Sequence, residues 1–119
     1  MNVGDIHWVD FPVATGREQQ GRRPAIVMQD DGHAGSLPTT MVVPLSTAMR
    51  AIRFAETALV AATKESRLRQ DSVALVFQFR AIDRSRVREM PGTISEAERD
   101  EVFRELRKLT GQTESYPTV

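Results

Sequence analysis

Residues 16–28 read GREQQGRRPAIVM, a polar loop between two glycines that is followed by two arginines and an apolar run. Glycine adopts backbone angles that other residues avoid, so we expect the loop between Gly16 and Gly21 to move as a lid. Pro24 has no N–H to donate, so it is expected at the first position of a short buried strand. Arg23 would then stand at the junction of loop and strand, where a guanidinium on a rigid sheet suits phosphate capture. The alternative is an ordinary hairpin connection whose arginines are merely solvated.

Composition narrows the class of protein. The chain has 119 residues, 40% hydrophobic and 27% charged, which predicts one globular domain over residues 1–111 with a loose tail at 112–119. It has no cysteine, which excludes disulfides and thiolate metal sites. It shows neither a run of ~18 apolar residues nor a basic-then-apolar leader, so we expect a cytoplasmic protein that is not bound to a membrane.

The basic residues are unusual in kind. The formal net charge is +0, which argues against a general polyanion binder. Yet 14 of the 16 basic residues are arginines, whose planar forks match phosphate oxygens and stack on bases. Codon bias in a GC-rich genome explains the excess equally well. Four of the arginines fall between Arg80 and Arg88.

Apolar runs and turn signals predict mostly short strands. We expect strands at residues 6–11, 25–28, 40–45, 57–61 and 71–79, the last continuing to residue 83. The mixed pattern of residues 6–11 indicates burial on both faces or a bulge, and Trp8 is expected in the core. Pro44 is expected at an edge or a bulge.

One helix closes the pattern. Ser95 and Glu98 form a capping box, and the helix is expected to stop before Gly111. Its predicted buried residues are Val102, Phe103, Leu106 and Leu109. Several short strands and one terminal helix together predict a mainly β small barrel with a C-terminal α-helix.

Four motifs occur in order along the chain: GDIHWVDF from Gly4, GREQQGRRPA from Gly16, VPLST from Val43 and QFRAID from Gln78. Together they resemble the MazF/PemK (Kid) family of toxin endoribonucleases from type II toxin–antitoxin pairs. The match runs from about Gly4 to the end of the last helix. The resemblance implies the SH3-like barrel of the MazF/Kid/CcdB type, working as a homodimer.

The resemblance also implies a site. In that family the arginine before the Pro-Ala pair and a threonine after the Val-Pro strand form the active centre, here Arg23 and Ser46. Because the family usually has threonine where this chain has Ser46, Thr47 stays open as the source of the hydroxyl. Glu18 matches a lid glutamate that supports catalysis in some members. Gln78 matches a glutamine near the site, but Phe77 stands where an acidic residue often precedes it.

Elimination leaves few other chemistries. His7 and His33 lack metal-ligand spacing, and no Ser nucleophile elbow or phosphate-binding Gly-Lys loop is present, so no metal or cofactor is expected. RNA can be cut without metal because its own 2′-OH attacks the adjacent phosphorus. Besides the four catalytic candidates, the predicted RNA contacts are Arg17, Gln19, Gln20, Arg22, Arg50, Arg53, Gln78 and Arg80, with the arginines up to Arg88 as further backbone contacts.

The sequence therefore predicts a sequence-specific, metal-independent endoribonuclease toxin that cleaves single-stranded RNA. The implied partner is a MazE-type antitoxin whose acidic segment covers the site, with DNA bound only through the toxin–antitoxin complex. Two alternatives stay open. One is a non-catalytic toxin of the same fold that binds DNA gyrase. The other is an inactive barrel that only binds its antitoxin or operator DNA.

Overall fold

The computed structural model describes residues 1–12, 16 and 21–112. The predicted lid and tail therefore lie almost wholly outside the described residues. The elements in chain order are β1 (Asp5–Phe11), β2 (Gly21–Val27), α1 (Asp31–Ala34), β3 (Thr39–Ser46), the 3-10 turn η1 (Met49–Arg53), β4 (Thr57–Val60), β5 (Ser72–Leu75), η2 (Val76–Gln78), β6 (Arg80–Asp83), η3 (Arg84–Arg86), β7 (Gly92–Thr93) and α2 (Glu96–Leu109).

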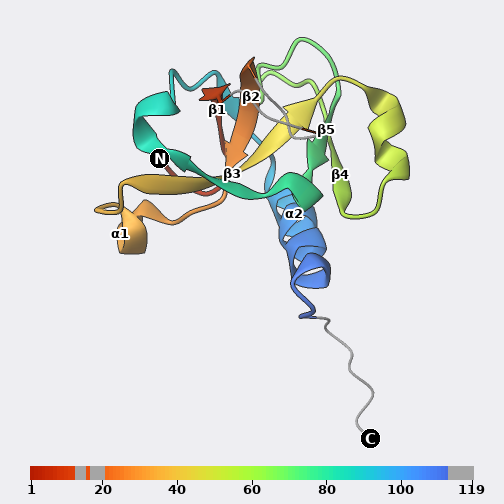
Figure 1. Cartoon of the computed structure of the whole chain (residues 1–119). Helices are drawn as coiled ribbons and strands as arrows, with labels where there is room; N and C mark the ends of the chain where they lie inside the picture. The colour runs from red at the N-terminus through yellow and green to blue at the C-terminus, as the bar shows by residue number, and fades with distance from the viewer. Residues whose placement is uncertain (13–15, 17–20, 113–119) are drawn as a thin grey trace, which may run out of the picture.

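Strand β3 is the centre of an antiparallel sheet with the order β4-β5-β3-β2-β1-β7. One edge of β3 pairs with β2, from Ala25↔Pro44 to Val27↔Val42. Its other edge pairs with two strands, β6 along its first half and β5 at its end. Figure 1 shows these strands wrapping around one another, with α2 projecting from one side.

The sheet curls because the chain after η3 returns to the outer edge of β1. Val9 bridges Val87, the Trp8 N–H donates to the Glu89 carbonyl at 3.0 Å, and the Arg88 N–H donates to the Trp8 carbonyl at 2.7 Å. The same segment follows β6, and β6 pairs with β3. Strands β1 and β3 are therefore linked in two ways, through β2 and through residues 80–89. The prediction of a mainly β small barrel with a C-terminal helix is confirmed.

The central strands are buried on both faces, which is the first of the two alternatives that the pattern of residues 6–11 left open. One core lies under α2 and includes Ile6, Ile26 and Val102, with Phe103 and Leu106 packed against it. The other fills the interior of the barrel and consists of Val9, Phe11, Ala25, Val27, Val42 and Ile82. Successive side chains along a strand point to opposite faces of the sheet, so neighbouring residues of these strands belong to different cores.

The prediction of one continuous strand over residues 71–83 is wrong, because the structure has two strands there, β5 and β6. Val42 and Leu45 are three residues apart on β3, but their partners Arg80 and Ala74 are six apart. The three extra residues form η2, a bulge between β5 and β6 that bends the chain along the curved edge of β3. Pro44 lies opposite this gap, so its expected place at a bulge is confirmed.

The expected start of the second strand at Pro24 is also wrong. Strand β2 begins at Gly21, and Pro24 pairs with Trp8 in the middle of it. Trp8 directs both its N–H and its carbonyl away from β2, toward Glu89 and Arg88, so this pair requires no donor from Pro24. The ladder to β3 begins only at Ala25, which leaves the proline nitrogen outside it.

Helix α2 follows the prediction at both ends. The Glu98 N–H donates to Ser95 Oγ at 3.1 Å and the Ser95 N–H donates to Glu98 Oε1 at 2.9 Å, which is the expected capping box. Two core assignments are wrong. Leu109, in the last turn of the helix, is 42% exposed, because the sheet no longer covers it there. Trp8 is only half-buried, because the core under α2 does not extend along β1 as far as Trp8.

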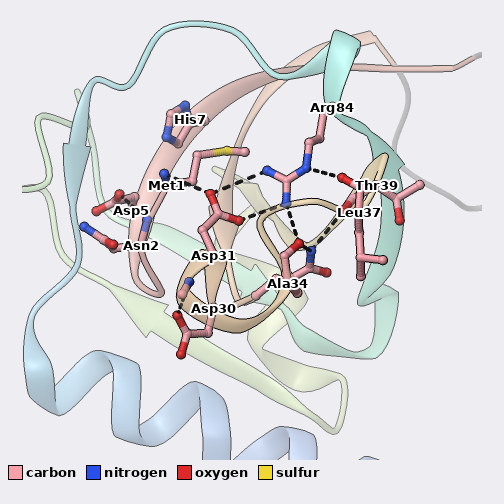
Figure 2. Close-up of polar contacts among 12 residues, drawn as sticks. Met1, Asn2, Asp5, His7, Asp30, Asp31, Ala34, Leu37, Thr39 and Arg84 are labelled. Carbon is pink, nitrogen blue, oxygen red and sulfur yellow. Dashed lines mark hydrogen bonds and ion pairs between the residues drawn. The ribbon is translucent and has the colours of Figure 1, made fainter.

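Arg84 ties α1 to the end of the barrel (Figure 2). The short helix α1 is capped by the Asp30 side chain, which accepts the Gly32 N–H. The Arg84 guanidinium donates to Asp31 Oδ1 at 2.9 Å, to the Ala34 carbonyl at 3.0 Å and, through Nε, to the Leu37 carbonyl at 2.6 Å. Its side chain is only 22% exposed. This arginine of the 80–88 cluster is thus used within the fold.

We expect Arg84→Gln to lower the free energy of unfolding by about 1–2 kcal/mol, since charge-assisted bonds to a half-buried carboxylate and two carbonyls are lost. Urea denaturation monitored by the Trp8 fluorescence measures the change. Arg86→Gln is the matched control, because Arg86 is exposed and makes one longer bond, to the Asp10 carbonyl at 3.3 Å. Equal losses in the two variants would contradict the assignment.

The same ion pair makes stability depend on pH. Arg84 first, and then the amino group of Met1, lowers the pKa of Asp31 below its usual value. A carboxyl whose pKa is lower in the folded state contributes stability above the unfolded pKa and loses it as pH falls through the folded pKa. The stability of Asp31→Asn should therefore fall less steeply than that of the wild type below pH ~4. Parallel acid limbs in the two denaturation series would exclude this role.

Candidate active site

Arg23 and Ser46 lie on the same face of adjacent strands. Ala25 pairs with Pro44 across β2 and β3, and each candidate lies two residues further along its own strand. Because side chains alternate, Arg23 shares the face of Ala25, and Ser46 shares the face of Pro44. This face lines the barrel interior. Arg23, which is exposed, and Ser46, which is half-buried, lie on it just beyond the buried residues. The structure thus brings together the two residues that the resemblance implied.

A groove of about 550 Å³ opens beside Ser46. We call it the Ser46 groove. Its principal lining residues are Ser46, Arg50, Phe54, Leu75, Phe77 and Gln78. It forms because β5 pairs with the end of β3 at Ser46↔Val73, while η1 packs Ala51 against Val73 and Leu75. Two predicted RNA contacts, Arg50 and Gln78, therefore reach the same concave surface as the predicted catalytic serine.

The Ser46 hydroxyl has a fixed local position. Its Oγ accepts the Ala48 N–H at 3.1 Å, which turns the chain out of β3 and into η1. That bond uses the hydroxyl oxygen as an acceptor and leaves the O–H able to donate. The hydroxyl can therefore present a proton toward an anion on the outer side of the groove.

Thr47 faces the other way. It lines a second groove of about 510 Å³, the Thr47 groove, whose principal lining residues are Trp8, Pro24, Thr47, Arg67, Arg69 and Ser72. Thr47 directly follows the last residue of β3, and the residues that line its groove differ from those that line the Ser46 groove. The two candidate hydroxyls are thus on opposite sides of β3, and only Ser46 shares a face with Arg23.

The neighbouring arginines Arg22 and Arg23 are separated in the same way. The Arg22 Nε donates to Asp10 Oδ1 at 2.9 Å, and the Arg88 Nε donates to Asp10 Oδ2 at 2.6 Å. Arg22 first, then Arg88, lowers the pKa of the half-buried Asp10 carboxyl, and Asp10 in turn raises the pKa of Arg22. This cluster lies across the sheet from Arg23, since Arg22 and Arg23 alternate along β2.

The remaining predicted contacts are spread more widely. Arg80 pairs with Val42, and its guanidinium stands 5.5 Å from the centre of the Phe11 ring, on the face that carries Arg23. Arg53 is exposed at the end of η1. Arg17, Glu18, Gln19 and Gln20 lie outside the described residues, so their predicted roles stay predictions.

The titratable residues of the described chain show no other centre of chemistry. His7 is buried, and its Nδ1 donates to the Arg88 carbonyl at 2.9 Å, while Asp30 contacts the exposed His33. Within the described ranges, no group of three His, Cys, Asp or Glu side chains could hold a metal ion. Among these same residues, no helix is long and apolar enough to cross a membrane.

Sequence reasoning missed the aromatic walls of the Ser46 groove. Phe54 stands in a polar, basic segment, and Phe77 was noted only as a departure from the resembling family. It also missed Arg67 and Arg69 beside Thr47. The sequence carried no clear signal for Phe77, because it continues an apolar run whose preceding residues, 72–76, are all buried.

Comparisons with known proteins identify the family and the fold. A family model described as PemK-like, MazF-like toxin of type II toxin–antitoxin systems matches residues 2–110. A protein named endoribonuclease MazF from Staphylococcus epidermidis is 30% identical over 99 residues, which cover 83% of this chain and 82% of that protein.

Two solved structures from Deinococcus radiodurans resemble the fold closely. A crystal structure of MazF has a TM-score of 0.77 and 27% identity, covering 93% of this chain and 96% of that one. A MazE–MazF structure has a TM-score of 0.72 and 26% identity, covering 95% and 97%.

Proposed function

Because this chain belongs to the PemK-like, MazF-like toxins of type II toxin–antitoxin systems, we propose that it is a sequence-specific endoribonuclease that cuts single-stranded RNA without a metal ion. The related protein named endoribonuclease MazF from Staphylococcus epidermidis supports the reaction class. The sequence leaves two alternatives open, a non-catalytic toxin of the same fold that binds DNA gyrase and an inactive barrel that binds only antitoxin or DNA. Neither alternative requires an arginine and a hydroxyl on the same face of the sheet.

The observation that carries the proposal is the shared face of Arg23 and Ser46 beside the Ser46 groove. An arginine fork binds two phosphate oxygens at once, and a serine hydroxyl can donate to a third. Both residues stand at strand positions, so their geometry is set before the substrate binds. Arg50 and Gln78 extend the binding surface along the groove, and Arg80 adds positive charge on the same face.

The reaction follows from these groups. The RNA 2′-OH attacks the adjacent phosphorus and the bond from phosphorus to the 5′ oxygen breaks, which leaves a 2′,3′-cyclic phosphate and a 5′-OH. Water can then open the cyclic phosphate to a 3′-phosphate. Arg23 and Ser46 hold the phosphate and stabilise the charge that develops on its oxygens. Arginine stays protonated in proteins and is a poor proton carrier, so the proton transfers need another group. We assign Glu18 a supporting role on the grounds of the family resemblance alone.

The partners follow from the family as well. The Deinococcus radiodurans structure is described as a complex of MazE with MazF. We propose that a MazE-type antitoxin inhibits this chain by laying an acidic segment over its arginine-bearing face. We also propose a homodimer in the cytoplasm that contacts DNA only as part of the toxin–antitoxin complex.

Arg23→Ala should abolish RNA cleavage while leaving the fold intact, because the side chain is exposed and contributes little to either core. Arg23→Lys should be much weaker than wild type, since a point charge does not reproduce the bidentate fork. Primer extension on a long RNA measures cleavage, and circular dichroism checks folding. Arg104→Ala is the matched control, because Arg104 is an exposed arginine on α2, which packs on the other core. Wild-type cleavage by Arg23→Ala would refute the mechanism.

Cleavage should persist in EDTA, because the described residues offer no metal site. Primer extension with purified protein in EDTA should show discrete cuts, which also identify the recognised sequence. Expression without antitoxin should arrest growth with loss of mRNA. Growth arrest with intact RNA and trapped gyrase–DNA complexes would instead establish the gyrase-binding alternative.

Ser46→Ala should lower the single-turnover cleavage rate by about ten- to a thousand-fold, the scale of losing one transition-state hydrogen bond. Ser46→Thr should retain activity, because the hydroxyl is kept. Thr47→Ala is the internal control and should have a small effect, since Thr47 lines the opposite groove. A dead Thr47→Ala beside an active Ser46→Ala would reverse the assignment. If neither matters, Arg23 must act with Glu18 or Gln78.

A further inference from the structure

Two phenylalanine rings stand in the wall of the Ser46 groove with much of their surface in water. Phe54 is 59% exposed and Phe77 is 37% exposed. Their centroids are 5.7 Å apart and their planes are tilted by 54°. Single exposed apolar residues are common on protein surfaces, but a contacting aromatic pair inside a groove is a feature of binding sites.

The backbone holds this pair in place. The Phe54 N–H donates to the Ala51 carbonyl at 3.0 Å, which fixes the end of η1. The Phe77 N–H donates to the Glu56 carbonyl at 3.2 Å, which ties η2 to the segment after η1. Glu56 adopts a positive φ of 57°, a conformation that brings the chain around toward η2. The rings thus rest on ordered backbone above Ala51 and Leu75 and form a preorganised surface.

Polar groups border the aromatic pair. Ser46, Arg50 and Gln78 line the same groove, and Gln78 is adjacent to Phe77 in the chain. An aliphatic partner side chain would pack on the rings but could form no hydrogen bond with the polar groups at their border. A nucleobase matches both features, because its flat face stacks on aromatic rings and its edge carries hydrogen-bond donors and acceptors.

We infer that Phe54 and Phe77 form a stacking site for one unpaired base next to the phosphate that Arg23 and Ser46 hold. This inference rests on the proposed function and adds to it a source of sequence recognition. Stacking accepts any base, so the choice among bases falls to Arg50 and Gln78 at the border of the rings. An arginine fork fits the N7 and O6 acceptors of guanine, which makes guanine the preferred occupant.

The test is a set of short RNAs that carry the recognised sequence, each with one base replaced by an abasic ribose. With wild-type protein, kcat/KM should fall by about 5- to 100-fold when the base next to the cut is removed. Phe54→Leu and Phe77→Leu should slow cleavage of the intact RNA to a similar degree. In these variants the abasic substitution at that position should cost little more, because the ring and the base act as one interaction.

Matched variants separate stacking from general apolarity. Phe77→Trp should retain the sensitivity to the abasic position, because it retains an aromatic face. Leu37→Ala, at a residue that is 49% exposed in the loop after α1, should behave as wild type. The inference is overturned if the leucine variants keep the full abasic effect. It is also overturned if analytical ultracentrifugation shows that they convert a dimer into monomers, since the rings would then contact a second copy of the chain.

Failure of the inference and failure of the proposed function give different results. If the wild-type protein cuts no RNA, the proposed function fails and the stacking site fails with it. If cleavage depends on Arg23 but the phenylalanine variants match wild type on every RNA, only the stacking site is wrong. Loss of preference for guanine in Arg50→Ala, with the stacking effect kept, would support the division of roles between rings and border.

Discussion

The pairing of β3 with three other strands is the constraint on which the rest of the structure depends. A strand has two edges, and β3 uses one for β2 and divides the other between β6 and β5. The division is possible because η2 inserts three residues opposite Pro44, a residue that has no N–H to offer at the gap. The barrel closes on one side of this gap, and α2 packs on the other side of the sheet (Figure 1).

The same gap produces the site. Where β5 takes over from β6, the end of β3 leaves the barrel interior and Ser46 reaches solvent beside η1 and η2. Phe77 lies in η2 and Phe54 directly follows η1, so the bulge that accommodates the curvature also supplies one wall of the groove. The candidate site therefore depends on the break in the strand. If residues 71–83 formed one continuous strand, residues 76–78 would pair with β3, and no concave surface would form next to Ser46.

Charge is distributed by the sheet as well. The chain is formally neutral, yet its arginines do not all serve one purpose. Arg84 is bonded to α1, and Arg22 and Arg88 share Asp10, whereas Arg50 and Arg80 lie on the same face as Arg23 and Ser46. A local basic surface can exist on a neutral protein because acidic partners neutralise the arginines elsewhere. This arrangement favours recognition of a defined anionic segment over general attraction to polyanions.

The sequence by itself determined the elements and the chemistry available to them. Strand periods and the capping box at Ser95 sufficed for a small barrel with one helix, since these depend on local spacing and residue type. The candidate pair Arg23 and Ser46 came from the resemblance that four motifs carry, and spacing alone did not provide it. Only the tertiary structure decided the break at η2, the place of Pro24 inside β2 and the separation of Thr47 from Ser46. It also decided that Arg84 supports the fold and that Phe77 stands in a groove. Each of these features depends on which strand, distant in the sequence, pairs with the segment in question. The local sequence pattern of a segment does not specify its pairing partner or the curvature of the sheet.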